Sequence, residues 1–166
     1  MRKLILAVLL CCAAPALAAP APKLSIHDLK ALPIVTMKPY DESANADAAV
    51  DAAFARAKKD HKLVLIDLGG NWCPDCIVLA NLMQLPEMRR FLGAHYDLAL
   101  VDVGRFNKNL QIPARFGITK RLQGVPSVLI ATPAGKLVNA GNVAALANAS
   151  TMNPQATADW LARWAK

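Results

Sequence analysis

Short runs of apolar residues along the chain alternate with segments of helical periodicity and with turn signals. Apolar positions three and four residues apart predict helices, whereas short continuous apolar runs predict buried strands. Helices are predicted at residues 46–59, from near 73, at 87–94, 112–116 and 157–165, and strands at 63–68, 98–103, 125–131 and 137–140. The alternation implies a parallel element, and the turn signal at 133–136 implies an antiparallel hairpin. We therefore expect an α/β fold with a mixed central sheet covered by helices on both faces.

The first eighteen residues have a different pattern from the rest of the chain. A basic start, an uncharged apolar run and a small-x-small motif predict a signal peptide that is cleaved after Ala18. The run is shorter than the roughly 20 residues that cross a bilayer, so we expect no stable membrane insertion after cleavage. An uncleaved anchor is the alternative. A lipoprotein is disfavoured, because Leu10 stands before Cys11 where a small residue is needed.

Three parts of the chain follow from these patterns: a cleaved signal peptide (1–18), a Pro- and Ala-rich linker with an extended lead-in (19–45), and one folded domain (46–166). The length of 166 residues suits a single domain with a real core. A signal peptide predicts a protein that is periplasmic or otherwise exported.

Charge adds little to the functional picture. The net charge is +7, and removal of the two basic residues of the signal leaves +5. Lys and Arg are scattered, apart from doublets at 58–59, 89–90 and 120–121, and we interpret them as solvated surface charge. No stripe of basic and aromatic residues is present, so no nucleic-acid partner is expected.

Cysteines carry the candidate chemistry. Cleavage removes Cys11 and Cys12 and leaves Cys73 and Cys76, spaced C-x-x-C. Two cysteines so close together would constrain very little chain, which argues against a structural disulfide. At a helix N-terminus, unpaired N–H groups and the helix dipole favour a thiolate. We therefore assign Cys73 as nucleophile and Cys76 as resolving thiol, with Asp75 between them opposing thiolate formation.

A metal site is the main alternative to a redox pair. One C-x-x-C supplies two of the four ligands that a closed zinc site needs. The three histidines, at positions 27, 61 and 95, each lack a neighbouring cysteine or histidine in the sequence that could complete such a site. The alternative reading is therefore a module that binds copper or zinc, or that holds a partner without turnover.

Two segments resemble the thioredoxin family. In residues 65–76, a buried strand carrying Asp67 runs into Trp72-Cys73-Pro74-Asp75-Cys76, and Gly124-Val125-Pro126-Ser127 is similar to the family's cis-proline loop. The order of elements agrees as well, so the resemblance covers residues 46–166. It implies a thioredoxin-like fold, with Cys73 as an exposed attacking thiol and Cys76 as a buried one.

The resemblance also implies roles for the residues around the pair. Asp67 would lie beneath it and move protons to and from Cys76; a solvated carboxylate at the strand end is the alternative. Pro126 would be cis and face the disulfide, with a trans turn as the alternative. The Val125 backbone would bind an extended substrate chain. Trp72 would shape the rim of the site or act as a packing aromatic.

Partners follow from the same resemblance. The substrates would be thiols and disulfides of exported proteins, with no cofactor beyond the Cys73–Cys76 disulfide. No dinucleotide fingerprint is present, so electrons would come from a small thiol or another thiol protein. The Cys-Pro-Asp-Cys motif departs from Cys-Gly-Pro-Cys, and the long segment 76–126 looks more like periplasmic domains supplied by a membrane thiol–disulfide interchange protein. We expect reductase or thiol-transfer work, with an oxidase or isomerase as the alternative.

Overall fold

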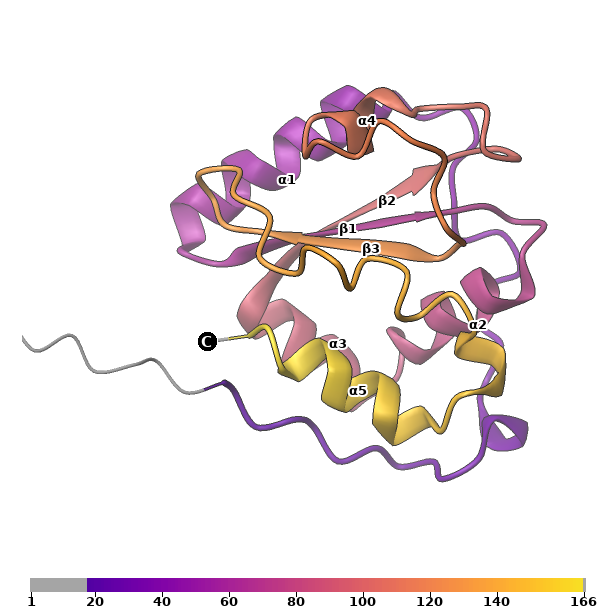
Figure 1. The fold of residues 1–166 in the computed structure, drawn as a ribbon. Coiled ribbons are helices and arrows are strands. Elements are labelled where there is room, and N and C mark those ends of the chain that lie inside the picture. The colour runs from indigo at the N-terminus through magenta and orange to yellow at the C-terminus, as the bar shows by residue number, and fades with distance from the viewer. Residues whose placement is uncertain (1–17, 166) are drawn as a thin grey trace, which may run out of the picture.

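A three-stranded mixed sheet lies at the centre of the computed structural model, which describes residues 18–165 (Figure 1). The middle strand, β1 (Leu63–Gly69), pairs in parallel with β2 (Tyr96–Asp102) and antiparallel with β3 (Ser127–Ala131). The predicted mixed sheet is therefore confirmed. Except for Ala18, the predicted signal peptide lies outside the described residues, and so do both of its cysteines.

Helices cover both faces of this sheet, as the sequence predicted (Figure 1). On one face lie α1 (Ala46–Asp60) and α4 (Gln111–Ala114), and on the other lie α2 (Pro74–Leu82), α3 (Pro86–His95) and α5 (Pro154–Ala162). Short 3₁₀ helices occur at η1 (Leu29–Ala31) and η2 (Ala149–Thr151).

Alternation along β1 divides the core into two clusters. Val64 and Ile66 pack with the buried residues of α1, whereas Leu65 packs with those of α2, α3 and α5. Successive side chains of a strand point to opposite faces, so Asp67 shares the face of Leu65. This register directs the only acidic residue of β1 towards the side on which α2 begins.

The predicted strand at 137–140 does not form. Only an isolated bridge joins Leu137 to Ala131, although the Val138 N–H still donates to the Ile130 carbonyl at 2.8 Å. The buried side chain of Asn139 then takes the place of a strand: its Oδ1 accepts from the Ile130 N–H at 2.9 Å, and its Nδ2 donates to the Val128 carbonyl at 2.8 Å. One amide side chain thus pairs the backbone edge that the missing strand would have paired.

The lead-in (19–45) runs beneath α5 and then up the side of the molecule to α1 (Figure 1). It packs against the domain, because Leu24 and Leu32 are buried in the cluster of α2, α3 and α5. Asn81 of α2 fastens it, with Oδ1 accepting from the N–H groups of Val35 at 2.7 Å and Thr36 at 3.0 Å. The lead-in is therefore a fixed part of the folded unit.

No helix within residues 18–165 is both long and apolar enough to cross a membrane.

Candidate active site

Cys73 occupies the N-cap of α2, where the sequence placed it. Its Sγ accepts from the Cys76 N–H at 3.4 Å, the contact that a capping side chain makes. Pro74 follows in the first turn, where its missing N–H leaves no bond unmade. The first cysteine therefore lies at the N-terminus of α2, with its sulfur in contact with a backbone N–H of the first turn.

Cys73 is less accessible than predicted. Its exposed fraction is only 4%, so the expectation of an exposed thiol is wrong in this structure. The loop before β3 lies against it, and the Cys73 thiol donates to the Val125 carbonyl at 3.4 Å. The Val125–Pro126 peptide bond is cis, in agreement with the prediction. The Ser127 hydroxyl donates to the Gly124 carbonyl at 2.7 Å and holds this loop closed on itself.

Two ionisable groups, Asp67 and Cys76, are fully buried beneath Cys73. Burial raises the pKa of Asp67 from 3.8 to about 7. Burial also raises the pKa of the Cys76 thiol far above its ordinary value, with smaller contributions from the contact to Cys73 and from the charge of Asp67. The interpretation of Asp67 as a solvated carboxylate at the strand end is therefore wrong. Near neutral pH, Asp67 can take or give a proton while Cys76 stays a thiol.

Tyr40, a residue of the lead-in, completes this buried group. Its hydroxyl donates to Asp67 Oδ2 at 2.8 Å, whereas Asp67 Oδ1 has no hydrogen-bond partner among the described residues. Burial raises the pKa of Tyr40 far above its ordinary value, with a further contribution from the Asp67 charge, so Tyr40 remains a donor. The hydrogen bond favours the ionised carboxylate and opposes the effect of burial on the pKa of Asp67.

Gly69 makes room for this arrangement at the end of β1. A Cβ at that position would stand 2.3 Å from Tyr40 Oη and 2.8 Å from Cys76 Sγ. Only a glycine allows the phenol to approach the strand so closely. The same contact places the Tyr40 hydroxyl next to the Cys76 sulfur, so Tyr40, Asp67 and Cys76 form one cluster.

Asn71 holds Tyr40 in place by pairing with its backbone. Asn71 Oδ1 accepts from the Tyr40 N–H at 3.0 Å, and Asn71 Nδ2 donates to the Tyr40 carbonyl at 2.8 Å. The turn between β1 and α2 therefore anchors the same lead-in residue that reaches Asp67.

Trp72 lies at the rim of the site, with 39% of its surface exposed. Its Nε1 donates to the Gly104 carbonyl at 2.7 Å, which joins the motif to the loop after β2. Arg105 lies over the Trp72 ring at 4.9 Å, and Phe106 meets the ring edge-on at 6.1 Å. Trp72 is thus a rim residue that also packs against its neighbours.

Asp75 is held by the segment before α5. Its Oδ1 accepts from the Ser150 N–H at 2.8 Å and from the Ser150 hydroxyl at 2.6 Å. Both bonds are made by the carboxylate of the residue that lies between the two cysteines in the sequence. They hold η2 against α2.

Residues 18–165 contain no group of three or more His, Cys, Asp or Glu side chains placed to hold a metal ion. Sequence reasoning brought Cys73, Cys76, Asp67 and the proline loop together correctly but missed Tyr40, whose one available signal was a lone aromatic residue in a Pro- and Ala-rich segment.

A scan of protein families matches residues 45–133 to a model described as thioredoxin-like. Among solved structures, the chain is similar to a disulphide isomerase from Xylella fastidiosa Temecula1, with 33% identity and a TM-score of 0.70, covering 76% of this chain and 95% of that one. It also matches a DsbH oxidoreductase at 21% identity and a TM-score of 0.42, covering 58% of this chain and 77% of that one. No curated protein matches. The family match and the first structural match agree with the mixed sheet and helices described above.

Proposed function

Because this chain belongs to the thioredoxin-like family, we propose that it is a thiol–disulfide oxidoreductase whose reacting groups are Cys73 and Cys76. The observation that carries the proposal is the buried cluster beneath the helix N-terminus: a thiol with a raised pKa beside an acid whose pKa lies near 7. Such a pair serves proton transfer between a resolving thiol and its base. The structural relative's name, a disulphide isomerase, supports the same class of chemistry.

In the first step, the Cys73 thiolate attacks one sulfur of a substrate disulfide. A bond forms between Cys73 Sγ and that sulfur, the substrate S–S bond breaks, and the other sulfur leaves as a thiolate that takes up a proton. The N–H of Cys76, 3.4 Å from Cys73 Sγ, stabilises the charge before the attack.

In the second step, Cys76 resolves the mixed disulfide. Its thiol gives its proton to the Asp67 carboxylate and attacks Cys73 Sγ, so that the Cys73–Cys76 bond forms. The second substrate sulfur then leaves and takes the proton from Asp67. Two electrons pass to the substrate, and the pair becomes a disulfide that an upstream thiol must reduce.

Tyr40 governs the base in this scheme. Its hydrogen bond to Asp67 Oδ2 keeps the pKa of the carboxyl near 7, where the group can both accept and release a proton. Without that bond, burial alone would favour the protonated acid, which cannot take the proton of Cys76. The lead-in therefore contributes directly to the site.

The cellular setting belongs to the proposal as well. The predicted signal peptide supports export to the periplasm or a similar oxidising compartment, with exported proteins as substrates. The upstream partner is then a thiol–disulfide interchange protein of the membrane. We favour reduction or thiol transfer as the direction, because an acid that relays a proton beneath the resolving thiol helps to release the substrate from the mixed disulfide.

The test is reduction of a model peptide disulfide by the purified protein spanning residues 19–166, with dithiothreitol as electron source. The Cys73→Ser variant should lose the catalysed rate. Retention of the full rate by Cys73→Ser would refute the proposal. The reduction potential of the pair gives the direction: a value near about −270 mV indicates a reductant and one near about −120 mV an oxidant.

A further inference from the structure

Four side chains at the rim of the site form a continuous series of contacts. Arg105 lies 4.9 Å over the Trp72 ring, Trp72 meets Phe106 edge-on at 6.1 Å, and Arg121 lies 4.4 Å over the Phe106 ring. We call these four residues the cation–aromatic platform. Its members come from the turn before α2, the loop after β2 and the segment before β3. The chain therefore assembles the platform from three separate places.

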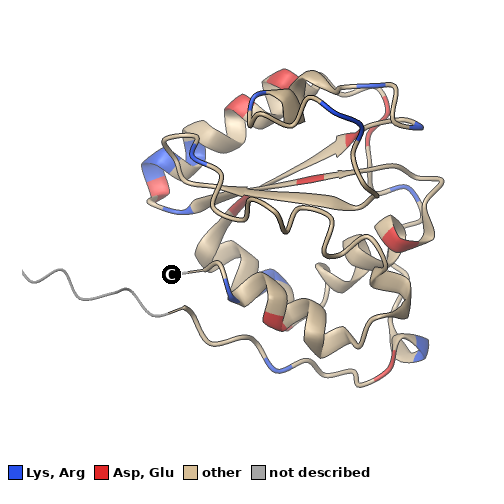
Figure 2. Ribbon diagram, in the orientation of Figure 1, with Lys and Arg blue, Asp and Glu red and all other residues tan. Residues whose placement is uncertain are grey.

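Within residues 18–165, no acidic side chain forms an ion pair with the platform's arginines. Arg105, Arg121 and the neighbouring Lys120 are exposed, and none of the ion pairs among the described residues includes them. Arg115 and Lys108 nearby are, in contrast, paired with carboxylates. Figure 2 shows Lys and Arg residues on the loop after β2 and on the segment before β3, at the end of the sheet where β1 leads into α2. The platform therefore carries positive charge that no ion pair among the described residues neutralises.

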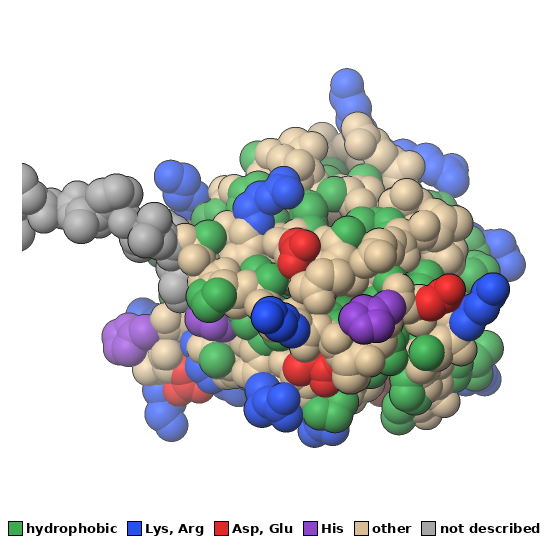
Figure 3. Space-filling model, turned by 90° about the horizontal axis from the view of Figure 1, so that it is seen from below, with side chains coloured by type: hydrophobic (Ala, Val, Ile, Leu, Met, Phe, Trp, Pro, Cys, Tyr) green, Lys and Arg blue, Asp and Glu red, His purple; other side chains and the backbone are tan. Residues whose placement is uncertain are grey.

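The face of the molecule that carries α5 also has exposed basic side chains (Figure 3), but they are not arranged on aromatic rings among the described residues. Figure 3 shows the face on which α5 lies, where basic, acidic and histidine side chains are spread among hydrophobic ones. An Arg doublet on α3, Arg89 and Arg90, is exposed like the platform's arginines and supplies a matched comparison. Neither of these two residues takes part in a cation–π contact among the described residues.

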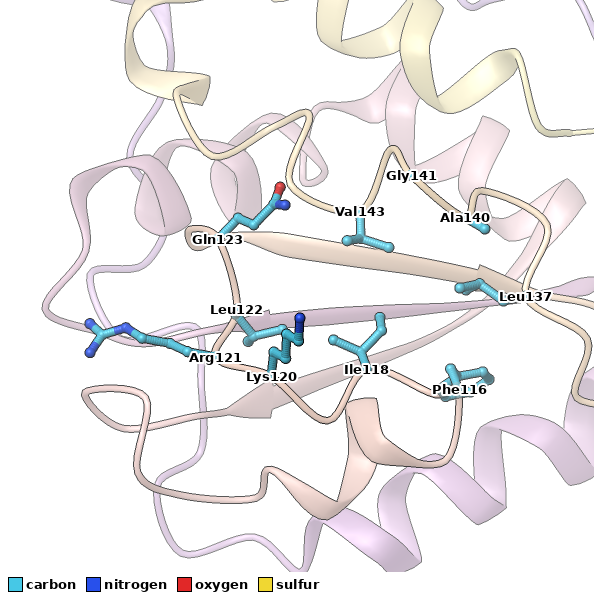
Figure 4. A pocket seen from close by; sticks show the side chains of 10 residues that line it. All are labelled: Phe116, Ile118, Lys120, Arg121, Leu122, Gln123, Leu137, Ala140, Gly141 and Val143. Atoms are coloured by element: carbon cyan, nitrogen blue, oxygen red, sulfur yellow. The ribbon is translucent and has the colours of Figure 1, made fainter.

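An apolar groove adjoins the platform. Two cavities of about 310 and 290 Å³ share Ile118, Lys120, Arg121 and Leu122, so they lie on either side of the same segment. Figure 4 shows Ile118 and Leu122 on one side of the larger cavity and Val143 on the other, while the Arg121 side chain points away from the other labelled residues. Phe106 and Leu110, which is 40% exposed, line the smaller cavity. Apolar walls and unpaired cations therefore meet in one surface.

Resting on the proposed function, we propose that this surface selects the substrate: it binds a polypeptide segment that carries acidic residues and an apolar side chain next to the disulfide. A guanidinium group that lies over an aromatic ring is restricted in its motion, and its N–H groups can bind a carboxylate in a two-point contact. The groove receives the apolar side chain. Trp72 precedes Cys73 directly, and Arg121 stands four residues before Val125 of the loop against Cys73, so a bound segment brings its disulfide to the thiol.

Binding tests this inference without any redox step. A fluorescein-labelled peptide with three Glu residues around a Leu, and its counterpart with Lys for Glu, are titrated with the Cys73→Ser protein and followed by anisotropy. We expect the acidic peptide to bind at least about tenfold more tightly at low salt. The preference should vanish as ionic strength rises from about 0.01 M to about 1 M, because the Debye length falls from about 30 Å to about 3 Å.

Variants locate the effect. Arg105→Gln with Arg121→Gln should abolish the preference, whereas Arg89→Gln with Arg90→Gln, which removes the same charge from α3, should keep it. Equal binding of the two peptides, or an equal loss in both double variants, would overturn the inference. Reduction of the uncharged hydroxyethyl disulfide by the protein with both cysteines serves as the second readout. If the protein does not catalyse this reduction, the proposed function is contradicted. If it does, but the two peptides bind equally well, only the role of the platform is contradicted.

Discussion

Replacing Tyr40 by Phe would remove one hydroxyl from the centre of the buried cluster and leave the ring in place. That hydroxyl donates to Asp67 Oδ2 at 2.8 Å and favours the charged carboxylate. A hydrogen bond to a charged group contributes about 1.5–3 kcal/mol, and 1.36 kcal/mol corresponds to one pH unit. Since Asp67 has a pKa of about 7 with the bond present, its ionisation should move upward by about 1 to 2 pH units without it.

The assay follows the Asp67 carboxyl signal in ¹³C NMR as the pH is raised, together with the rate of mixed-disulfide resolution. In the variant the pH at which resolution reaches half its maximal rate should rise by the same amount, about 1 to 2 pH units, because only the ionised acid accepts the Cys76 proton. Tyr96→Phe is the matched control: its hydroxyl is also buried but donates to the Leu161 carbonyl at 2.6 Å. An unchanged titration in Tyr40→Phe, or an equal shift in Tyr96→Phe, would refute the role given to Tyr40.

Three further substitutions test the buried acid, the close approach of Tyr40 to β1 and the backbone pairing of β3. In Asp67→Asn the charge is gone. Because the folded-state pKa of Asp67 is raised from 3.8 to about 7, the native carboxylate destabilises the fold as pH rises through that window. Urea denaturation should therefore show the variant more stable by about 4 kcal/mol at pH 8 and by less than about 1 kcal/mol at pH 4. A gain that is the same at both pH values would contradict this. In Gly69→Ala the new Cβ would stand 2.3 Å from Tyr40 Oη, so the free energy of unfolding, measured with urea, should fall by about 1–3 kcal/mol. An unchanged midpoint of urea unfolding would mean that the phenol is not held at this position. In Asn139→Ala two buried backbone groups lose their partners, which should lower stability by about 2–4 kcal/mol and speed hydrogen exchange at the Ile130 amide; slow exchange there would show that another group pairs it.

Sequence reasoning found the parts of the site that have local signals. The resemblance to the thioredoxin family identified Asp67, and the C-x-x-C spacing at a helix start identified the thiols. Tyr40 offers only a lone aromatic residue as a signal, and its contact with Asp67 depends on where a Pro- and Ala-rich segment returns to the domain. Asn139 was misassigned for a related reason: a run of residues suited to a strand gave no sign that one amide side chain would take over the backbone pairing.

Accessibility was the other property that local patterns could not supply. The helix cap predicted where Cys73 would lie, but its 4% exposure depends on a loop some fifty positions later in the chain, whose carbonyl accepts from the thiol. The platform around Trp72 likewise joins three separate segments. Such contacts between distant segments follow from the fold and not from any one motif.

Trapping of the mixed disulfide tests the central claim most directly. Reduced Cys76→Ser protein is mixed with a peptide disulfide, quenched with acid, and the adduct is mapped by mass spectrometry. The division of roles between the two cysteines predicts a stable adduct of one peptide on Cys73, because the thiol that would release it is absent. Failure of Cys76→Ser to form an adduct, or an adduct of Cys73→Ser on Cys76 that forms equally fast, would contradict it.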